Sequence, residues 1–347
     1  MSRNWYKSTG DCSDIVISTR VRLARNLSHY PFPGRMDDAM QEALLSELRD
    51  VMEREKDTFG DDYTFIDMTQ LSDNERLAMT EQHLISTEFE TSPAKRALIV
   101  NGDQTVSIMV NEEDHVRIQC IMSGLAINEC YDLASKIDDC LDRALGFAFS
   151  NQYGYLTKCP TNVGTGMRVS VMMNLTALFL SGKMSSTVQS LSKLGLTVRG
   201  MYGEGSLPYG NLYQISNQVT LGLSEHEILE KLHTIARQLV ENERNTRSVR
   251  VAGRRDQIED YCYRSLGMMK AARIMTSMET INLLNGVRYG VSTGLLPDID
   301  FALLNEIMVR TQKANLMMQY ENENMSEEER DAVRAEYIRA KLAKVEL

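Results

Sequence analysis

Hydrophobic and polar positions follow two different periods along this chain, and the period changes near residue 255. In residues 14–23 the two kinds alternate, with Ile15, Ile17, Val21 and Leu23 on one face and Ser18, Arg20 and Arg22 on the other. Such alternation predicts a strand with one buried face. Further strands are expected at 96–101, 106–111, 116–121 and 168–174. The Asn-Gly-Asp-Gln stretch at 101–104 predicts a hairpin turn between the first two of these.

Apolar residues three and four positions apart mark the predicted helices. Residues 39–52 and 133–145 have this spacing, which is typical of amphipathic helices. Ser224 with Glu227, and Ser326 with Glu329, form capping-box signatures that open two more helices. The first of these fades into a charged stretch at 241–256, after which only helical patterns remain. We therefore expect a mixed α+β domain over 1–255 and an all-helical domain over 256–347.

Composition and charge narrow the class of protein. The 347 residues carry a formal net charge of -10, which disfavours direct nucleic-acid binding because phosphate contacts require a basic face. No run of about 18 apolar residues appears, and residues 1–10 lack the apolar core of a signal peptide. The six cysteines form no CxxC pair, and the histidines have no ligand-like spacing. We expect a cytoplasmic protein with reduced thiols, no membrane segment and no metal site.

Arginines recur at points that could converge on one ligand. Arg20, Arg22 and Arg25 lie on the first predicted strand, and the others are Arg117, Arg168 and Arg199. Converging guanidinium groups repel one another unless a polyanion lies between them, and a nucleoside triphosphate is such a ligand. The chain has no GxxxxGK[ST] loop, so arginines would have to hold the phosphates. The alternative is that each arginine is a solvated or salt-bridged surface residue.

Three further segments could carry chemistry beside such an anion. Residues 111–117 read NEEDHVR, and strand parity would put Glu113 on the same face as Arg117, where it could act as a general base. Glu204 lies between two glycines, as in a mobile loop that brings a charge over a site. Cys159 opens CPTNVGTGMR, residues 159–168, whose glycines would let backbone N–H groups approach a charged ligand. Plainer explanations are an acidic turn, a glycine turn and an inert buried thiol.

These segments together resemble the ATP:guanido phosphotransferase (phosphagen kinase) family. The matching motifs are STRVRLAR (18–25), NEEDHVR (111–117), CPTNVGTGMR (159–168), VRG (198–200) and ISN (215–217), in the family's order. Only 17 residues precede Ser18, so we do not expect the helical domain that creatine and arginine kinases carry before this strand. The chain is most similar to the McsB-type bacterial protein arginine kinases, and RDAVRA at 330–335 fits their RDxxRA motif. Gln214 departs from the acidic residue that other members often have before ISN.

The resemblance implies an antiparallel sheet flanked by helices, and transfer of the γ-phosphoryl of ATP, with Mg²⁺, to arginine side chains of substrate proteins. It assigns Glu113 as the base, with Glu204 and Cys159 also catalytic. It assigns ATP binding to Ser18, Arg20, Arg22, Arg117, Arg168 and Arg199, and allosteric phosphoarginine binding to Arg330, Asp331, Arg334 and Ala335. Phosphorylation would mark proteins for Clp-type proteolysis in a stress response. Implied partners are a zinc-finger activator, a heat-shock repressor, a Clp ATPase and a second copy in a homodimer. The alternatives are a kinase of a small free guanidine and a non-catalytic phosphoarginine-binding adaptor.

Overall fold

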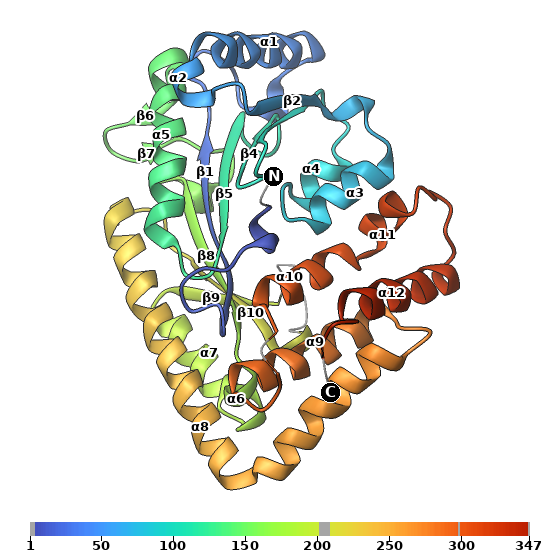
Figure 1. Ribbon diagram of the computed structural model, residues 1–347. Coiled ribbons are helices and arrows are strands. Elements are labelled where there is room, and N and C mark those ends of the chain that lie inside the picture. Colours follow the sequence, from blue (N-terminus) through green and yellow to red (C-terminus); the bar gives the residue numbers. More distant parts are fainter. Residues whose placement is uncertain (1–3, 201–208, 298, 346–347) are drawn as a thin grey trace.

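An eight-stranded antiparallel sheet forms the centre of the molecule (Figure 1). The computed structural model describes residues 4–200, 209–297 and 299–345. The strands lie in the order β2-β3-β4-β5-β1-β8-β10-β9. Their bounds are β1 (Val16–Arg25), β2 (Tyr63–Asp67), β3 (Ala97–Asn101), β4 (Val106–Val110), β5 (Val116–Ser123), β8 (Met167–Asn174), β9 (Leu196–Arg199) and β10 (Leu212–Asn217). A separate hairpin consists of β6 (Phe149–Ser150) and β7 (Gly154–Tyr155). The predicted α+β class is confirmed.

Helices cover both faces of the sheet and make up the whole C-terminal part. Those that precede residue 255 are α1 (Asp38–Arg54), α2 (Lys56–Phe59), α3 (Asp73–Glu81), α4 (Thr87–Thr91), α5 (Ile127–Leu145), α6 (Thr176–Leu180) and α7 (Met184–Lys193). The longest, α8 (Glu225–Ala271), crosses that position, and α9 (Ser277–Ser292), α10 (Phe301–Arg310), α11 (Lys313–Gln319) and α12 (Glu327–Lys341) follow it. Both predicted capping boxes, at Ser224 and Ser326, are present. No helix among the described residues is long and apolar enough to span a bilayer.

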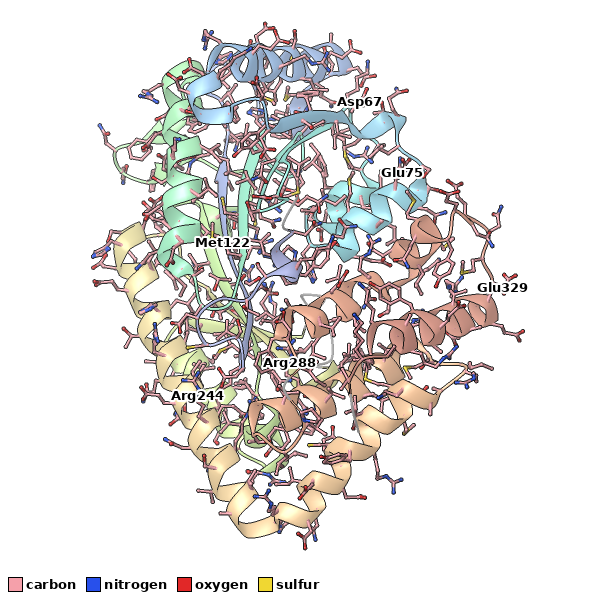
Figure 2. All side chains as sticks on the ribbon, in the orientation of Figure 1. Asp67, Glu75, Met122, Arg244, Arg288 and Glu329 are labelled. Carbon is pink, nitrogen blue, oxygen red and sulfur yellow. The ribbon has the colours of Figure 1, made fainter. Side chains whose placement is uncertain are left out.

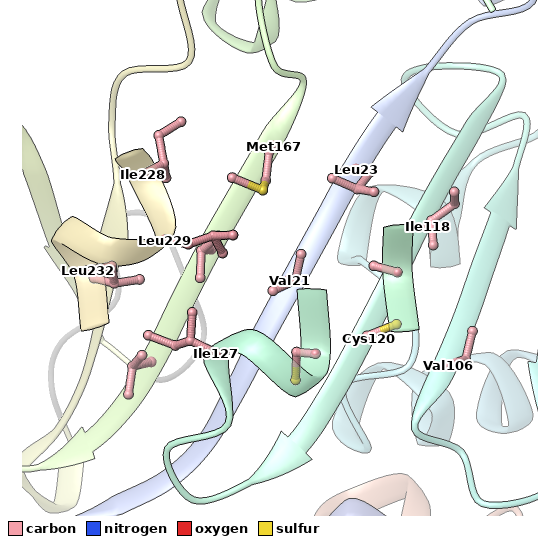
Figure 3. Packing of buried hydrophobic residues seen from close by; sticks show 14 of the residues in the cluster. Val21, Leu23, Val106, Ile118, Cys120, Ile127, Met167, Ile228, Leu229 and Leu232 are labelled. Carbon is pink, nitrogen blue, oxygen red and sulfur yellow. The ribbon is translucent and has the colours of Figure 1, made fainter. Parts of the chain in front are cut away.

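One face of the sheet is apolar and packs under α5 and the first half of α8. Val21 and Leu23 of β1 lie in this core with residues of both helices, as Figure 3 shows around Ile127 and Leu229. This burial removes a large apolar area from water and is the main stabilising contribution of the domain. Ile17 departs from the predicted parity, because the strand register shifts between Val16 and Ser18. The irregularity sends Ile17 into the core of the other face.

The opposite face of the sheet is covered by α4, by the N-terminal 3-10 helix η1 and by the C-terminal helices. Over β3 and β4, α4 and the residues around it enclose a small core that includes Phe89 and Met109. At the start of β1 and the end of β5, which are neighbours in the sheet, Ile17 and Ile121 are buried in a second core. This core is shared with the 3-10 helix η1 (Trp5–Lys7) and the C-terminal helices. Between these two regions lies the polar part of the face.

The helix α8 connects the two parts of the chain without a loop. It runs along the sheet, bends and continues beside the C-terminal helices (Figure 1). The bend is at Arg254, whose φ of -148° and ψ of 41° are not helical. The charged stretch expected to end this helix is itself helical. Within it the buried Glu243 accepts hydrogen bonds from the backbone N–H groups of Ala177 and Leu178 and pairs with Arg247 at 2.8 Å.

Polar contacts join the C-terminal helices to the rest of the molecule. Glu81 of α3 accepts hydrogen bonds from the backbone N–H groups of Ala314 and Asn315, at 3.0 and 2.9 Å, and so caps α11. Arg288 of α9 donates to the carbonyl of Ser13 at 3.2 Å, and Arg244 of α8 pairs with Asp14 (Figure 2). The N-terminal segment, the sheet and the helical part are therefore held in one arrangement.

Candidate active site

Strand register brings four of the predicted arginines onto the polar face of the sheet. Arg22 of β1 is paired with Arg168 of β8 on one side and with Gln119 of β5 on the other. Arg20 follows two residues away on the same face, and Arg117 stands two residues from Gln119. The period-two alternation is the reason that these side chains share a face.

Burial and mutual repulsion make this arginine cluster electrostatically costly. Burial, followed by the charges of Arg20, Arg117 and Arg168, holds the pKa of Arg22 well below its usual range. Burial and the charges of Arg168 and Arg117 lower the pKa of Arg20 to about 10. Among the described atoms, the buried Nε of Arg22 has no hydrogen-bond partner. Such a cluster is suited to an anion with several charges, which would relieve the repulsion and accept the donors.

Arg25, on the same strand, belongs to the opposite side of the sheet. It pairs with Asp138 of α5 at 2.9 Å, and both side chains are buried. Its guanidinium also stacks on the ring of Tyr155 at 3.5 Å and donates to the carbonyl of Thr165 at 2.9 Å. Arg25 is therefore a structural residue that ties β1 to α5 and to the segment before β8.

The acidic segment before Arg117 is a loop, so the predicted strand parity does not apply to it. β5 begins only at Val116, and Asn111 turns the chain with a φ of 62°. Arg117 consequently pairs with both neighbouring acids, with Glu112 at 2.6 Å and with Glu113 at 3.1 Å. The Glu112 side chain is buried and also accepts from Ser86 Oγ at 2.6 Å. Sequence analysis did not single out Glu112, and the signal that it missed was the turn at Asn111.

Glu113 has the environment of a carboxylate that can accept a proton. Its pKa is raised, first by burial and then by the charges of Asp114 and Glu112, whereas Arg117 and Lys158 act in the opposite direction. Burial is the largest cause of this rise in pKa. The Glu113 side chain keeps 38% of its surface exposed, so a substrate can reach it.

Asp114 and His115 position this loop. Asp114 is fully buried and accepts from Asn26 Nδ2 at 2.6 Å and from the backbone N–H of Lys158 at 2.7 Å. His115 accepts from the backbone N–H of Leu27 through Nδ1, and its Nε2 lies 2.9 Å from the carbonyl of Pro31. The bond from Lys158 to Asp114 brings the segment that contains Cys159 next to the loop that contains Glu113.

Cys159 is partly exposed at the start of the turn η4 (Pro160–Asn162), with its Sγ 3.0 Å from Thr161 Oγ1. The sequence suggested that the glycines after Cys159 let backbone N–H groups approach a ligand. In the structure, Gly164 and Gly166 let backbone segments of the protein pack closely together. A Cβ on Gly164, whose φ is 113°, would lie 2.2 Å from the carbonyl oxygen of Thr220. A Cβ on Gly166 would lie 2.6 Å from the carbonyl oxygen of Ala24. These glycines let the chain pack against its own backbone and so set the start of β8, which carries Arg168.

A recess adjoins the arginine cluster at Arg20. Its polar lining includes Ser18, Arg20, His83 and Gln214. Burial and the charge of Arg20 lower the pKa of His83 to about 3, so its imidazole is neutral. Sequence analysis excluded His83 from metal binding and assigned it no other role, because only tertiary structure brings it to Arg20. Ser18 lies in this recess, two residues from Arg20 on the same face.

Two predicted residues stand at the edge of the described chain. Arg199 ends β9 and is paired with Gln214 of β10. Glu204 lies outside the described residues. Among the described residues there is no group of three His, Cys, Asp or Glu side chains that could hold a metal ion.

The RDxxRA residues lie on α12, far along the chain from this site. Arg334 is buried and donates to the carbonyls of Thr311 and Met275 at 2.9 and 2.8 Å, and it also pairs with Asp331. Arg330 is partly exposed and donates to the carbonyl of Met325 at 2.5 Å. Ala335 is fully buried. The two arginines therefore stand in unlike environments.

Comparisons with known proteins agree with this architecture. Residues 44–246 match the model of the ATP:guanido phosphotransferase C-terminal catalytic domain, and residues 255–347 match that of the protein-arginine kinase McsB C-terminal domain. The protein-arginine kinase of Desulforamulus reducens is 43% identical over 340 residues, which cover 97% of this chain and 95% of the relative. That of Brevibacillus brevis is 42% identical over 343 residues, which cover 99% and 96%.

A solved structure is also similar. The duplicated taurocyamine kinase of Schistosoma mansoni, with bound transition state analog components, aligns with a TM-score of 0.60 at 25% identity. The alignment covers 70% of this chain and 36% of that one. The chain belongs to the ATP:guanido phosphotransferase family, and it joins the catalytic domain of that family to a C-terminal domain of the McsB type.

Proposed function

We propose that this ATP-dependent guanidino kinase phosphorylates arginine side chains of substrate proteins. The observation that carries the proposal is the junction of the arginine cluster with Glu113 and Cys159, together with full-length relatives named protein-arginine kinase. The cluster would hold the phosphates of ATP on the polar face of the sheet.

The chemical problem is that a guanidinium is protonated and is a poor nucleophile. In the proposed reaction Glu113 takes a proton from the guanidinium, and the freed nitrogen attacks the γ-phosphorus. A nitrogen–phosphorus bond forms while the bond from phosphorus to the bridging oxygen breaks, and ADP leaves. Arg20, Arg22, Arg117, Arg168 and Arg199 would stabilise the charge that spreads over the transferred group. Mg²⁺ would enter with ATP, held mostly by phosphate oxygens and water.

Other parts of the site would orient the acceptor. Cys159 follows Lys158, whose backbone N–H is bonded to Asp114, the residue after Glu113. In the proposed complex Cys159 would lie against the guanidinium. Glu204 would supply a second carboxylate. Cys159 and Glu204, which would orient the acceptor, both precede the bend of α8 at Arg254. We therefore place the boundary between the catalytic and the helical part at this bend, between 1–255 and 256–347.

The C-terminal part would recognise phosphoarginine through Arg330, Asp331, Arg334 and Ala335. Arg334 is already bonded to backbone carbonyls and to Asp331, so it would act mainly by fixing α12, with Arg330 as the more accessible donor. By the family resemblance we further propose a cytoplasmic homodimer that works with a zinc-finger activator, a heat-shock repressor and a Clp ATPase.

The choice of acceptor tests the proposal. The enzyme is incubated with Mg-ATP and either an unstructured protein, free arginine or creatine, and ADP formation and acceptor phosphorylation are measured. We expect phosphorylation of the protein. Phosphorylation of a free guanidine with the protein left unmodified would make the chain a small-guanidine kinase, and no ATP turnover with any acceptor would favour the adaptor.

A further inference from the structure

The two segments that would face the acceptor guanidinium meet at one buried side chain, that of Asn26. This residue directly follows β1 and is 1% exposed. Its Oδ1 accepts from the backbone N–H of His115 at 2.9 Å, in the loop that contains Glu113. Its Nδ2 donates to the carbonyl of Leu156 at 3.0 Å, in the segment that leads to Cys159. One amide therefore contacts both segments, which are far apart in the sequence.

The partners of Asn26 fix the orientation of its amide. A backbone N–H can only donate and a backbone carbonyl can only accept, so Oδ1 must face His115 and Nδ2 must face Leu156. Nδ2 also donates to Asp114 Oδ1 at 2.6 Å. Because the side chain both donates and accepts at this point, a flipped amide would lose these bonds. The position therefore requires an amide, and an aspartate of the same shape could not replace it.

Asp114 adds a second connection between the same two segments. Its Oδ1 accepts from the backbone N–H of Lys158 at 2.7 Å as well as from Asn26. The Asp114 side chain is fully buried, and a buried carboxylate needs hydrogen bonds in place of the water that it has lost. Removal of the Asn26 amide would break its bonds to both segments and would also take one donor from Asp114.

We propose that Asn26 is a positioning residue, which fixes the loop of Glu113 and the segment of Cys159 relative to each other around the acceptor guanidinium. The inference rests on the proposed function, because it takes Glu113 and Cys159 as the groups that face the acceptor. Phosphoryl transfer needs the reacting groups in a narrow range of positions, and a misplacement of about 1 Å can cost about 100-fold in rate. The arginine cluster on the sheet does not use this amide, so ATP binding should be independent of it.

Kinetics of the full-length Asn26→Ala variant test the proposal. With Mg-ATP and an unstructured protein as acceptor, kcat should fall about 10- to 100-fold, while the calorimetric Kd for Mg-ATP stays within about two-fold. Asn315→Ala is the matched control, because Asn315 is also 1% exposed and its amide both donates and accepts, but on α11. Equal loss of kcat in both variants, or a parallel loss of ATP affinity in Asn26→Ala, would overturn the proposal. Absence of kinase activity in the wild type would instead remove the proposed function.

Alkylation of Cys159 gives a test that does not depend on activity. Cys159 is partly exposed and the other five cysteines are buried, so iodoacetamide should label Cys159 in the folded protein and the others only after unfolding. In Asn26→Ala the labelling of Cys159 should be faster by about three-fold or more, with the buried cysteines still unlabelled. Asn315→Ala should label like the wild type. An unchanged rate at Cys159 in Asn26→Ala would contradict the proposal.

Hydrogen exchange in the wild type decides the question if Asn26→Ala does not fold. The backbone N–H groups of His115 and Lys158 donate to Asn26 and to Asp114, from the two different segments. If the amide joins these segments, both groups should be exposed in the same opening event and show similar protection. Protection factors that differ by about ten-fold or more would show that the segments open separately, and would overturn the proposal.

Discussion

Arg22 and Arg25 lie three residues apart on β1, yet their removal should have opposite consequences. Arg25 pairs with Asp138 at 2.9 Å, with both side chains buried. Replacement by methionine would leave the Asp138 carboxylate without its cation, and breaking a buried pair in this way costs about 3–5 kcal/mol of unfolding free energy. Burial already raises the pKa of Asp138 in spite of Arg25.

Without Arg25 the pKa of Asp138 would rise further, which gives the loss of stability a pH dependence. A group with a raised folded-state pKa is favoured in its protonated form, so the penalty is greatest at neutral pH and shrinks as pH falls through that pKa. Arg22 is the reverse case, because burial and neighbouring positive charges already disfavour its charged form. Arg22→Met should therefore keep or raise the unfolding free energy, while ATP binding weakens about 10- to 100-fold through loss of charged hydrogen bonds.

Urea unfolding and calorimetric titration with Mg-ATP measure the two effects separately. Arg35→Met is the matched control, since Arg35 is an exposed arginine, and it should change neither quantity. The reasoning would be refuted if Arg22→Met lost as much stability as Arg25→Met. It would also be refuted if Arg25→Met kept its stability and lost ATP binding instead.

Two further predictions concern the base and the C-terminal helix. Glu113→Gln should lower kcat by about 10²–10⁴-fold without loss of stability at neutral pH, because burial already disfavours the charged carboxylate. In a pH profile, the wild type should lose activity on acidification at a pH above the ordinary glutamate range. An unchanged kcat in the variant would remove the assignment of Glu113 as the base. Arg334→Ala should destabilise the protein by about 1–3 kcal/mol by leaving buried carbonyls unpaired, whereas Arg330→Ala should unfold like the wild type and lose any response to added phosphoarginine; equal melting of the two variants would contradict this difference.

The regular parts of the fold were predictable because their patterns are local. The alternation in β1 and the capping boxes at Ser224 and Ser326 depend on neighbouring residues, and each is present. The hairpin between β3 and β4 is also where the sequence indicates it. By contrast, the strands β2 and β9 are short edge strands, and their few residues carry too little periodicity to be recognised.

The wrong predictions concern features that the pattern of hydrophobic and polar residues does not encode. The register shift beside Ser18 redirects Ile17 to the other core, and the turn at Asn111 lets Glu112 and Glu113 reach the same arginine. The charged stretch remained helical because Glu243 is buried, where it caps α6 and pairs with Arg247. His83 joins the site only through the packing of distant segments. Residue types thus indicated the chemistry, while tertiary contacts determined which residues share it.

Direct detection of the product is the measurement that tests the proposed function most closely. The wild-type protein and Glu113→Gln are each incubated with Mg-ATP and an unstructured protein, and the acceptor is analysed by mass spectrometry at neutral pH and again after brief acid treatment. We predict an acid-labile phosphoryl group on arginine residues with the wild type and none with Glu113→Gln. Phosphorylation that survives acid, on hydroxyl side chains, or equal arginine phosphorylation by the variant would contradict the account.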